Sequence, residues 1–211
     1  MTWQPCLPAE IEAESFRRIE AQVGPHHLPP EIWFVVRRMI HTSADPEYLA
    51  SARLHPRAIA AGVEALRHGC PVATDTRMLL AGISTGRLDR LGVTAFCLMD
   101  DPEVAAEAAR RGTTRAEVAM ERSLPKLAGG IVAIGNAPTA LLRLLELLAA
   151  GAPPPALVVG VPVGFVSAAE SKDALAGQDC PYITALGPKG GSALAASIIN
   201  ALAIMALEVP S

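Results

Sequence analysis

Ile131-Val132-Ala133-Ile134-Gly135-Asn136-Ala137-Pro138 is the stretch of sequence that decides the fold. Its first four residues are apolar and mostly β-branched, which is typical of a buried strand. Gly135 and Asn136 then allow a tight turn, and Pro138 suits the start of a helix. The stretch therefore predicts a strand that leads through a turn directly into a helix, the unit from which parallel α/β sheets are built.

Short apolar runs of the same kind recur after residue 70, and helical segments separate them. The later runs begin roughly 25 to 30 residues apart, which fits units in which a crossover helix joins two parallel strands. The predicted fold class is α/β, with a mostly parallel sheet of about five strands flanked by helices and an N-terminal helical segment. The expected strands are Pro71 to Thr74, Val93 to Leu98, Ile131 to Ile134, Leu157 to Val161 and Tyr182 to Ala185.

The first 70 residues are expected to be helical rather than extended, because their apolar residues recur at helical spacing. One helix spans Pro8 to Val23. A second begins at the Pro29-Pro30 pair and stops at Asp45-Pro46, which places His41 at its C-terminal end. A third runs from about Pro56 to His68. No strand is predicted in this part of the chain.

The composition indicates a single folded domain, residues 1–211, with a sizeable core. Of the 211 residues, 51% are apolar and 18% are charged, the reverse of the balance found in disordered chains. The net charge of −3, without a basic stripe, gives no general attraction to nucleic acid or to an acidic membrane. The N-terminus lacks the pattern of a signal peptide. Polar residues interrupt the apolar stretch Ser192 to Val209, so we expect a buried core helix there and no membrane span.

The four cysteines give no sign of a disulfide framework or a metal site. Cys6, Cys70, Cys97 and Cys180 lie far apart, without a CxxC pair and without a histidine at metal-ligand spacing. Reduced thiols in a cytoplasmic protein are the simplest interpretation.

Glycine-rich turns follow three of the expected strands, in Gly135 to Pro138, Gly160 to Lys172 and Gly187 to Ser192. Ligands of open α/β sheets bind beyond the carboxyl ends of the strands, where helix N-termini present free N–H groups to an anion. A single such turn is more often an ordinary tight connection, but three together, with Lys189 in the last, favour an anionic ligand. The nucleotide motifs GxxxxGK[ST] and GxGxxG are absent, which disfavours a dinucleotide.

Four polar residues are candidates for the chemistry of this site. His41 lies at a helix C-terminus, which favours the imidazolium form, so we hypothesise a proton donor; the alternative is a capping histidine. Arg115 can present a planar fork to a carboxylate, or can simply be exposed. Ser15 can bond a ligand, or can bond back to the carbonyl of Ile11. Asp75 either caps the helix that follows it, the more common role, or faces the site.

Four stretches together resemble the precorrin-8X methylmutase family, also called precorrin isomerase, of cobalamin biosynthesis. They are Ile11-Glu12-Ala13-Glu14-Ser15-Phe16 with Ile19, Met39-Ile40-His41-Thr42-Ser43-Ala44-Asp45, Gly130 to Leu141, and Gly160 to Lys172. The turn Gly187-Pro188-Lys189-Gly190-Gly191-Ser192 follows at the family's usual place, so the resemblance covers essentially the whole chain. Two positions depart from the family pattern, where Ala44 replaces a glycine and Ala116 replaces a serine.

The resemblance implies a homodimeric enzyme without a cofactor that moves a methyl group between neighbouring carbons of ring C in a corrin precursor. It also implies that His41 protonates the ring C nitrogen or holds that proton, and that Arg115 and Ser15 contact the substrate. A flat apolar ring with many carboxylate arms fits an apolar slot rimmed by N–H donors and a few cations. The substrate contacts expected on both grounds are Ser15, Arg115, Asn136, Gly164, Lys189, Gly190 and Gly191.

Two other functions use the same turns. One is an α/β enzyme acting on a phosphorylated metabolite, and the other is a non-catalytic carrier of a corrinoid intermediate. The sequence leaves open whether the substrate contains cobalt, and how much of the site a partner subunit contributes.

Overall fold

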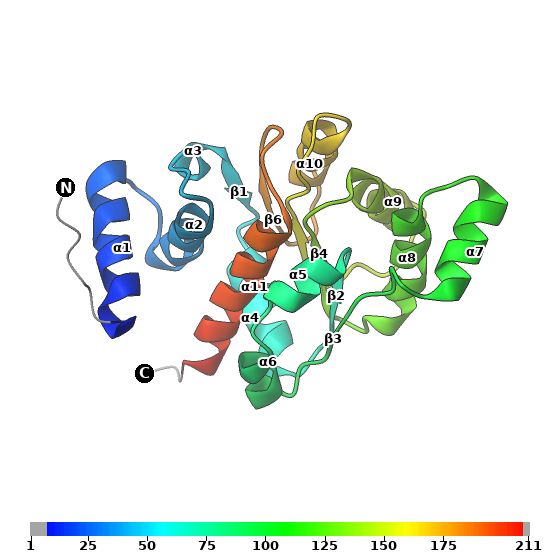
Figure 1. Cartoon of the computed structure of the whole chain (residues 1–211), viewed down its shortest axis with the longest axis horizontal. Coiled ribbons are helices and arrows are strands. Elements are labelled where there is room, and N and C mark those ends of the chain that lie inside the picture. The colour runs from blue at the N-terminus through cyan, green and yellow to red at the C-terminus, as the bar shows by residue number, and fades with distance from the viewer. Residues whose placement is uncertain (1–7, 209–211) are drawn as a thin grey trace.

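A six-stranded sheet forms the centre of the molecule in the computed structural model, which describes residues 8–208 (Figure 1). Its strand order is β1-β6-β5-β4-β2-β3; β1 pairs with β6 antiparallel and all other neighbours are parallel. The bounds are β1 Ala52–Leu54, β2 Val72–Thr74, β3 Ala95–Phe96, β4 Ile131–Ile134, β5 Leu157–Gly160 and β6 Tyr182–Ala185. The predicted α/β class with a mostly parallel sheet is confirmed, and the five expected strands are all present.

The sixth strand, β1, corrects the prediction that the first 70 residues are helical throughout. It is only three residues long and follows directly on the short helix α3 (Tyr48–Ser51), so it shows no alternating pattern that a sequence can reveal. Pairing with β6 creates it, with Ala52 opposite Ala185 and Leu54 opposite Ile183. Tertiary contact thus overrides the local helical preference at this edge.

Helices cover both faces of the sheet, and strand residues alternate between the two layers. Ile131 and Ala133 pack in one apolar cluster, whereas Val132 and Ile134 pack in the other. On the first face lie α2 Pro30–Ser43, α4 Ala58–Arg67, α5 Arg77–Gly82, α6 Thr85–Leu91 and α11 Ser192–Leu207; on the second lie α8 Arg115–Ser123, α9 Pro138–Ala149 and α10 Ala168–Ala176. Burial on both faces explains why the strands are continuously apolar.

Two helices extend the molecule at its ends (Figure 1). Helix α1 (Pro8–Val23) packs against α2, and α7 (Pro102–Arg111) packs against α8, at opposite ends of the long axis. A short 3-10 helix, η1 (Leu124–Lys126), precedes β4. The apolar stretch at the C-terminus is a buried core helix, α11, as predicted. Within residues 8–208 no helix has the length and apolarity needed to cross a membrane.

The helix boundaries follow the local sequence signals. Pro30 occupies the first turn of α2 after Pro29, and the helix ends at Ser43, so that His41 lies in its last turn. Thr114 accepts a hydrogen bond from the Glu117 N–H at the start of α8, as its spacing from Glu117 predicts. These signals place the candidate residues at helix ends.

Candidate active site

The residues predicted to form the site lie at the carboxyl edge of the sheet, in two groups. His41 at the end of α2, Ser15 on α1 and Lys189 after β6 form the first group. Asn136 after β4 and Arg115 at the start of α8 form the second, because a 3.1 Å hydrogen bond between Thr114 and Thr139 joins the starts of α8 and α9. In Figure 1, α1 and α2 lie on the opposite side of the sheet from α8.

A hydrogen bond joins His41 to Ser15. The Ser15 hydroxyl lies 2.7 Å from His41 Nδ1, so it does not serve the alternative role of bonding back to Ile11. If Ser15 donates to Nδ1, the neutral ring carries its hydrogen on Nε2; if the ring is protonated, Nδ1 donates to Ser15 and Nε2 again carries a hydrogen. In these two forms Nε2 of this exposed imidazole is a donor, whereas in the third form, a neutral ring that donates from Nδ1 to Ser15, Nε2 is an acceptor.

The imidazole is also held from the side of α1. The Phe16 ring meets it edge-on, with ring centroids 5.4 Å apart, and the Arg37 guanidinium lies 4.2 Å from the centre of Phe16. Two ion pairs join the helices, from Arg38 to Glu12 at 3.2 Å and from Arg37 to Glu20 at 2.5 Å. Packing and charge therefore fix the angle between α1 and α2, and with it the ring of His41.

Ala44 ends α2 in the left-handed conformation, with φ 54° and ψ 29°. The resemblance leads us to expect a glycine at this position, and the alanine found here adopts a glycine-like backbone. A left-handed residue with a Cβ costs about 1–2 kcal/mol. The departure leaves the turn intact but strained, immediately after the helix that carries His41.

Lys189 forms ion pairs with two carboxylates of the segment that follows α2. Its Nζ lies 2.6 Å from Asp45 Oδ2 and 2.7 Å from Glu47 Oε2. The hydrogen bond from Lys189 lowers the pKa of Asp45, and the two carboxylates raise the pKa of Lys189 above its usual value. The Lys189 ammonium is therefore already paired within the protein. The sequence alone predicts instead a cation that is available to a substrate carboxylate.

The glycine-rich turns are bonded to each other. The Gly191 N–H donates to the Val161 carbonyl at 2.9 Å, and the Gly164 N–H donates to the Pro188 carbonyl at 3.1 Å. A side chain at Gly190 would collide with the Val161 and Pro162 carbonyls. Two of the N–H groups expected to face an anion are thus used inside the protein, whereas Gly190 N has no backbone acceptor among the described residues.

Asp75 fills the third turn. Its carboxylate accepts hydrogen bonds from the N–H groups of Gly135, Asn136 and Ala137 at 3.1, 2.7 and 2.8 Å. Burial raises the pKa of this carboxyl, and the three N–H donors act in the opposite direction. The helix that follows Asp75 is α5, and Thr76 caps it by accepting a hydrogen bond from the Leu79 N–H. The expectation that Asp75 caps this helix is therefore wrong.

This turn lies at the point of the sheet where α/β proteins most often bind ligands. The connection from β2 runs to α5 on one face and that from β4 runs to α9 on the other, so the strand order reverses between β2 and β4. Because Asp75 already occupies the N–H groups of Gly135, Asn136 and Ala137 in the turn before α9, this turn does not offer those groups to an anion. The expectation of three equivalent anion-binding turns is therefore wrong for the Gly135 to Pro138 turn.

Arg115 and Asn136 are both exposed, and no hydrogen bond or ion pair of either side chain is found within residues 8–208. Ala116, where the resemblance leads us to expect a serine, follows Arg115 in α8 and is buried. The second group therefore offers one guanidinium and one amide to a ligand.

Several residues beside the site were not assigned a role from the sequence. Lys172 on α10 is completely buried and donates to the Lys189 carbonyl at 2.5 Å. Its burial has a signal in hindsight, because Ala168, Ser171, Lys172 and Leu175 follow helical spacing along one buried face. Val163, Phe165 and Val166, which we call the apolar lip, are exposed by 44%, 99% and 82%.

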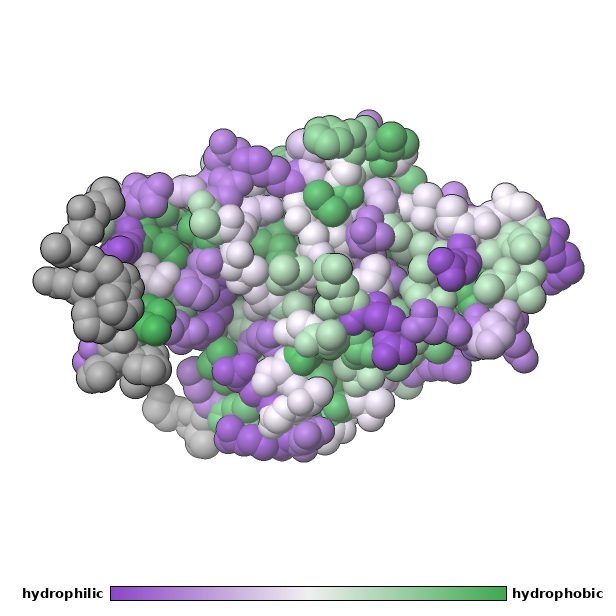
Figure 2. All heavy atoms as spheres, viewed as in Figure 1, coloured by the Kyte–Doolittle hydropathy of each residue, from purple (hydrophilic) through white to green (hydrophobic). Residues whose placement is uncertain are grey.

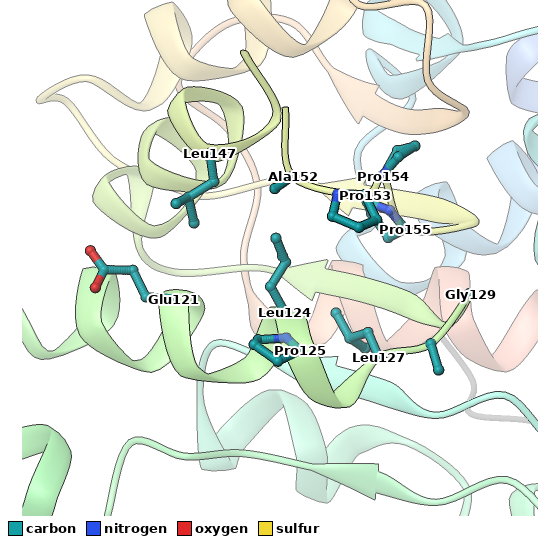
Figure 3. Close-up of a pocket in the computed structure, with 11 residues that line it drawn as sticks. Glu121, Leu124, Pro125, Leu127, Gly129, Leu147, Ala152, Pro153, Pro154 and Pro155 are labelled. Carbon is teal, nitrogen blue, oxygen red and sulfur yellow. The ribbon is translucent and has the colours of Figure 1, made fainter. Parts of the chain in front are cut away.

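The cavities differ between the two edges of the sheet. A small cavity of about 150 Å³ adjoins His41 and Ser15. A larger one of about 470 Å³ lies at the opposite, amino edge, and its walls are leucines and prolines that precede β4 and β5 (Figure 3). Glu121 is the only charged residue that lines the larger cavity, which makes it a poor match for a ligand with several carboxylates. Among residues 8–208 no three His, Cys, Asp or Glu side chains converge as metal ligands.

The fold and the site define an α/β protein that presents a histidine donor and a guanidinium along one edge of a mostly parallel sheet. The sequence model of the precorrin-8X methylmutase family matches residues 10–205, and the chain belongs to this family. It is 45% identical to the cobalt-precorrin-8 methylmutase of Priestia megaterium, over 94% of this chain and 88% of that one. It is 42% identical to the precorrin-8X methylmutase of Pseudomonas aeruginosa, over 92% and 93%.

A solved structure has the same fold. The precorrin-8X methylmutase of Thermus thermophilus superposes with a TM-score of 0.85 at 43% identity, covering 93% of this chain and 97% of that one. The family resemblance inferred from the four stretches is thereby confirmed.

Proposed function

We propose that this protein isomerises precorrin-8X, or its cobalt-containing counterpart, by moving a methyl group within ring C to give hydrogenobyrinate or cobyrinate in cobalamin biosynthesis. Family membership over residues 10–205 supports the reaction. The observation that carries the assignment to this site is the Ser15–His41 hydrogen bond, which orients an exposed imidazole through Nδ1 and leaves Nε2 for the substrate.

His41 is the proposed catalytic residue. With Nε2–H directed at the ring C nitrogen, it delivers or holds a proton there while the methyl group moves between adjacent carbons. A positioned general acid contributes on the order of 10²–10⁴-fold to a rate. Ser15 occupies Nδ1, and when its hydroxyl donates to that atom, or when the ring is protonated, Nε2 carries the hydrogen that this role needs. The chemistry asked of the protein is therefore positioning and one proton.

The remaining substrate contacts are proposed along the carboxyl edge. Arg115, Asn136 and the N–H of Gly190 are available for carboxylate arms. Gly164, Gly191 and Lys189 contribute to the shape of the rim, since their polar groups are already bonded within the protein. The proposed ligand is a tetrapyrrole with several carboxylates, and we propose neither a cofactor nor a nucleic-acid partner.

We propose that two copies form the working enzyme. Pockets that bind compact organic ligands measure about 300–1,000 Å³, whereas the cavity beside His41 measures about 150 Å³. A second wall is needed to enclose a tetrapyrrole. The apolar lip supplies an exposed surface of the kind that marks protein interfaces. We further propose that residues 1–211 act as one domain and that the enzyme works in the cytoplasm, where its dispersed cysteines stay reduced.

The test is the absorption spectrum after mixing the purified protein with precorrin-8X and, separately, with cobalt-precorrin-8. We expect a change toward the hydrogenobyrinate or cobyrinate chromophore with one of them, and no conversion by His41→Ala although it still binds. If neither substrate is converted, the proposal is refuted. If His41→Ala binds the tetrapyrrole and retains biological function, the protein is a carrier instead.

A further inference from the structure

Lys172 is an unusual residue for the interior of a protein. Its residue surface is completely buried in α10, and the described part of the chain places no carboxylate in an ion pair with it. Its Nζ donates to the main-chain carbonyl of Lys189 at 2.5 Å. Burial without a counter-ion lowers the pKa of Lys172 to about 8. Burying an ammonium is costly, so a hydrophobic residue would be expected here if the position served packing alone.

Lys189 continues the chain of contacts. The residue that accepts from Lys172 through its carbonyl donates through its side chain to Asp45 and Glu47. Its own turn is fixed by the Gly191 N–H bond to Val161. Lys189 therefore joins a buried anchor in α10 to the segment that follows α2.

The segment it reaches determines where α2 ends. Asp45 uses both carboxylate oxygens, one for Lys189 and one for the Glu47 N–H at 3.0 Å, and its own N–H donates to Ser43 Oγ at 3.2 Å. Ala44 lies between Ser43 and Asp45 in its left-handed conformation. These contacts hold a strained turn in place directly behind His41.

An ion pair in this position contributes little to stability, because Lys189 is 49% and Glu47 76% exposed and solvent screens them. Its effect on geometry is larger, since a misplacement of about 1 Å at a reacting group can cost on the order of 10²-fold in rate. The contacts therefore affect catalysis more than folding.

We propose that Lys172 and Lys189 act in series as positioning residues for His41, with Lys172 fixing the main chain of Lys189 and Lys189 fixing Asp45 and Glu47. Neither lysine touches the substrate in this role. The inference deepens the proposed function, because it gives Lys189 a task within the protein in place of a substrate carboxylate.

The experiment uses the chain's three lysines, Lys126, Lys172 and Lys189. Lys172→Met and Lys189→Met are compared with Lys126→Met, an exposed lysine in η1 at the opposite edge of the sheet. We expect kcat to fall by about tenfold or more in both test variants, with KM changed less than about threefold, and no change in the control. Lys189→Arg, which keeps the ion pairs, should restore most of the activity. The kcat of the double variant should be no lower than that of the less active single variant, because both lysines belong to one chain of contacts.

The His41 ring signals in proton–nitrogen NMR spectra supply a readout that does not need turnover. We expect them to move in Lys172→Met and in Lys189→Met, and to stay in place in Lys126→Met. This readout separates the inference from the proposed function, because it holds even for a protein that converts no precorrin. If Lys172→Met is too unstable to study, Asp45→Asn tests the same chain of contacts at its other end, where Lys189 meets Asp45.

Two results would overturn the inference. One is unchanged kcat and unchanged His41 signals in folded Lys172→Met, or in Asp45→Asn where it takes that variant's place. The other is a Lys189→Met variant that raises KM without lowering kcat, since that pattern identifies Lys189 as a substrate ligand.

Discussion

His41 and Ser15 show how far single residues can be interpreted from sequence. Both were predicted as site residues, and the structure brings them within 2.7 Å of each other although 26 positions separate them. The contact itself was not predicted, because periodicity places a residue on a helix face but does not give the angle between two helices. The Lys189–Asp45 contact, across 144 positions, was missed for the same reason.

Ser15→Ala should lower kcat by roughly tenfold while the protein stays folded, because the ring loses the group that fixes its orientation. Steady-state kinetics with precorrin-8X provide the measurement. Ser197→Ala, which removes a hydroxyl bonded only within α11, is the control and should be neutral in rate. Equal rates for Ser15→Ala and the unmodified protein would show that Ser15 does not orient the histidine.

Ala44→Gly should stabilise the protein by about 0.5–1 kcal/mol, because glycine removes the strain at φ 54° and gives back part of the gain as unfolded-state entropy. Thermal denaturation should show a Tm rise of about 2 °C. The matched control is Ala105→Gly on the exposed face of α7, which should lower the Tm, since glycine is unfavourable inside a helix. A drop in Tm for Ala44→Gly would mean that the turn is not strained.

The buried amine of Lys172 should make stability depend on alkaline pH. Its folded-state pKa is about 8 and its ordinary value 10.5, so between these values the unfolded chain binds more protons and the free energy of unfolding rises with pH on this account. Lys172→Met removes that contribution. Urea denaturation at pH 7 and pH 9.5 should therefore show the methionine variant gaining most over the unmodified protein at pH 7. A difference between the two proteins that does not change with pH would contradict this expectation.

At the scale of elements, the sequence predicts the strands that have a distinct apolar run. It does not predict the very short strand β1 or the hydrogen-bond partners of the glycine-rich turns. The strands at Ile131–Ile134 and Tyr182–Ala185 have the predicted bounds, because each is a short, mostly buried run between turn residues. β1 escaped notice because three residues carry no period. The glycine-rich turns were located correctly, but their N–H groups were expected to be free. Which acceptor meets an N–H depends on neighbouring strands and not on the turn's own sequence.

Asp75 acts at this scale as a built-in anion for the turn that leads into α9. Asp75→Ala should cost about 2–4 kcal/mol, because it leaves three N–H donors unpaired, two of them buried. We expect added sulfate to recover part of the loss by binding the vacated N–H groups of the turn. The measurement is the rise in Tm with sulfate, for the variant and for the unmodified protein, against sodium chloride of equal ionic strength. An equal rise in both proteins would indicate only the general effect of the salt.

At the scale of the whole molecule, the sequence predicted the layered α/β architecture but not how its surface is used. The proposed site extends along the carboxyl edge from α1 and α2 to α8 (Figure 1), and the apolar lip lies at the same edge, in the loop between β5 and α10. Figure 2 shows apolar residues on the surface at the top of this view, among polar neighbours. A monomer with nothing packed on such a surface is uncommon.

Phe165→Asp should shift the proposed dimer to a monomer, because it places a charge in the middle of the apolar lip. Sedimentation velocity at several concentrations measures the shift. Met78→Asp, on α5 and 74% exposed, is the control for simply adding a charge to an exposed apolar position. If Phe165→Asp remains a dimer at the same concentrations, the lip is not the contact between copies.

The distribution of lysines also matters for handling the protein. Lys172 is enclosed, Lys189 is held by two carboxylates, and Lys126 is exposed at the amino edge, away from His41. Amine-reactive dyes and coupling surfaces should therefore attach at Lys126 in preference to the other two lysines. A sensor chip or fluorescent label introduced in this way would leave the edge that holds His41 turned toward the solution.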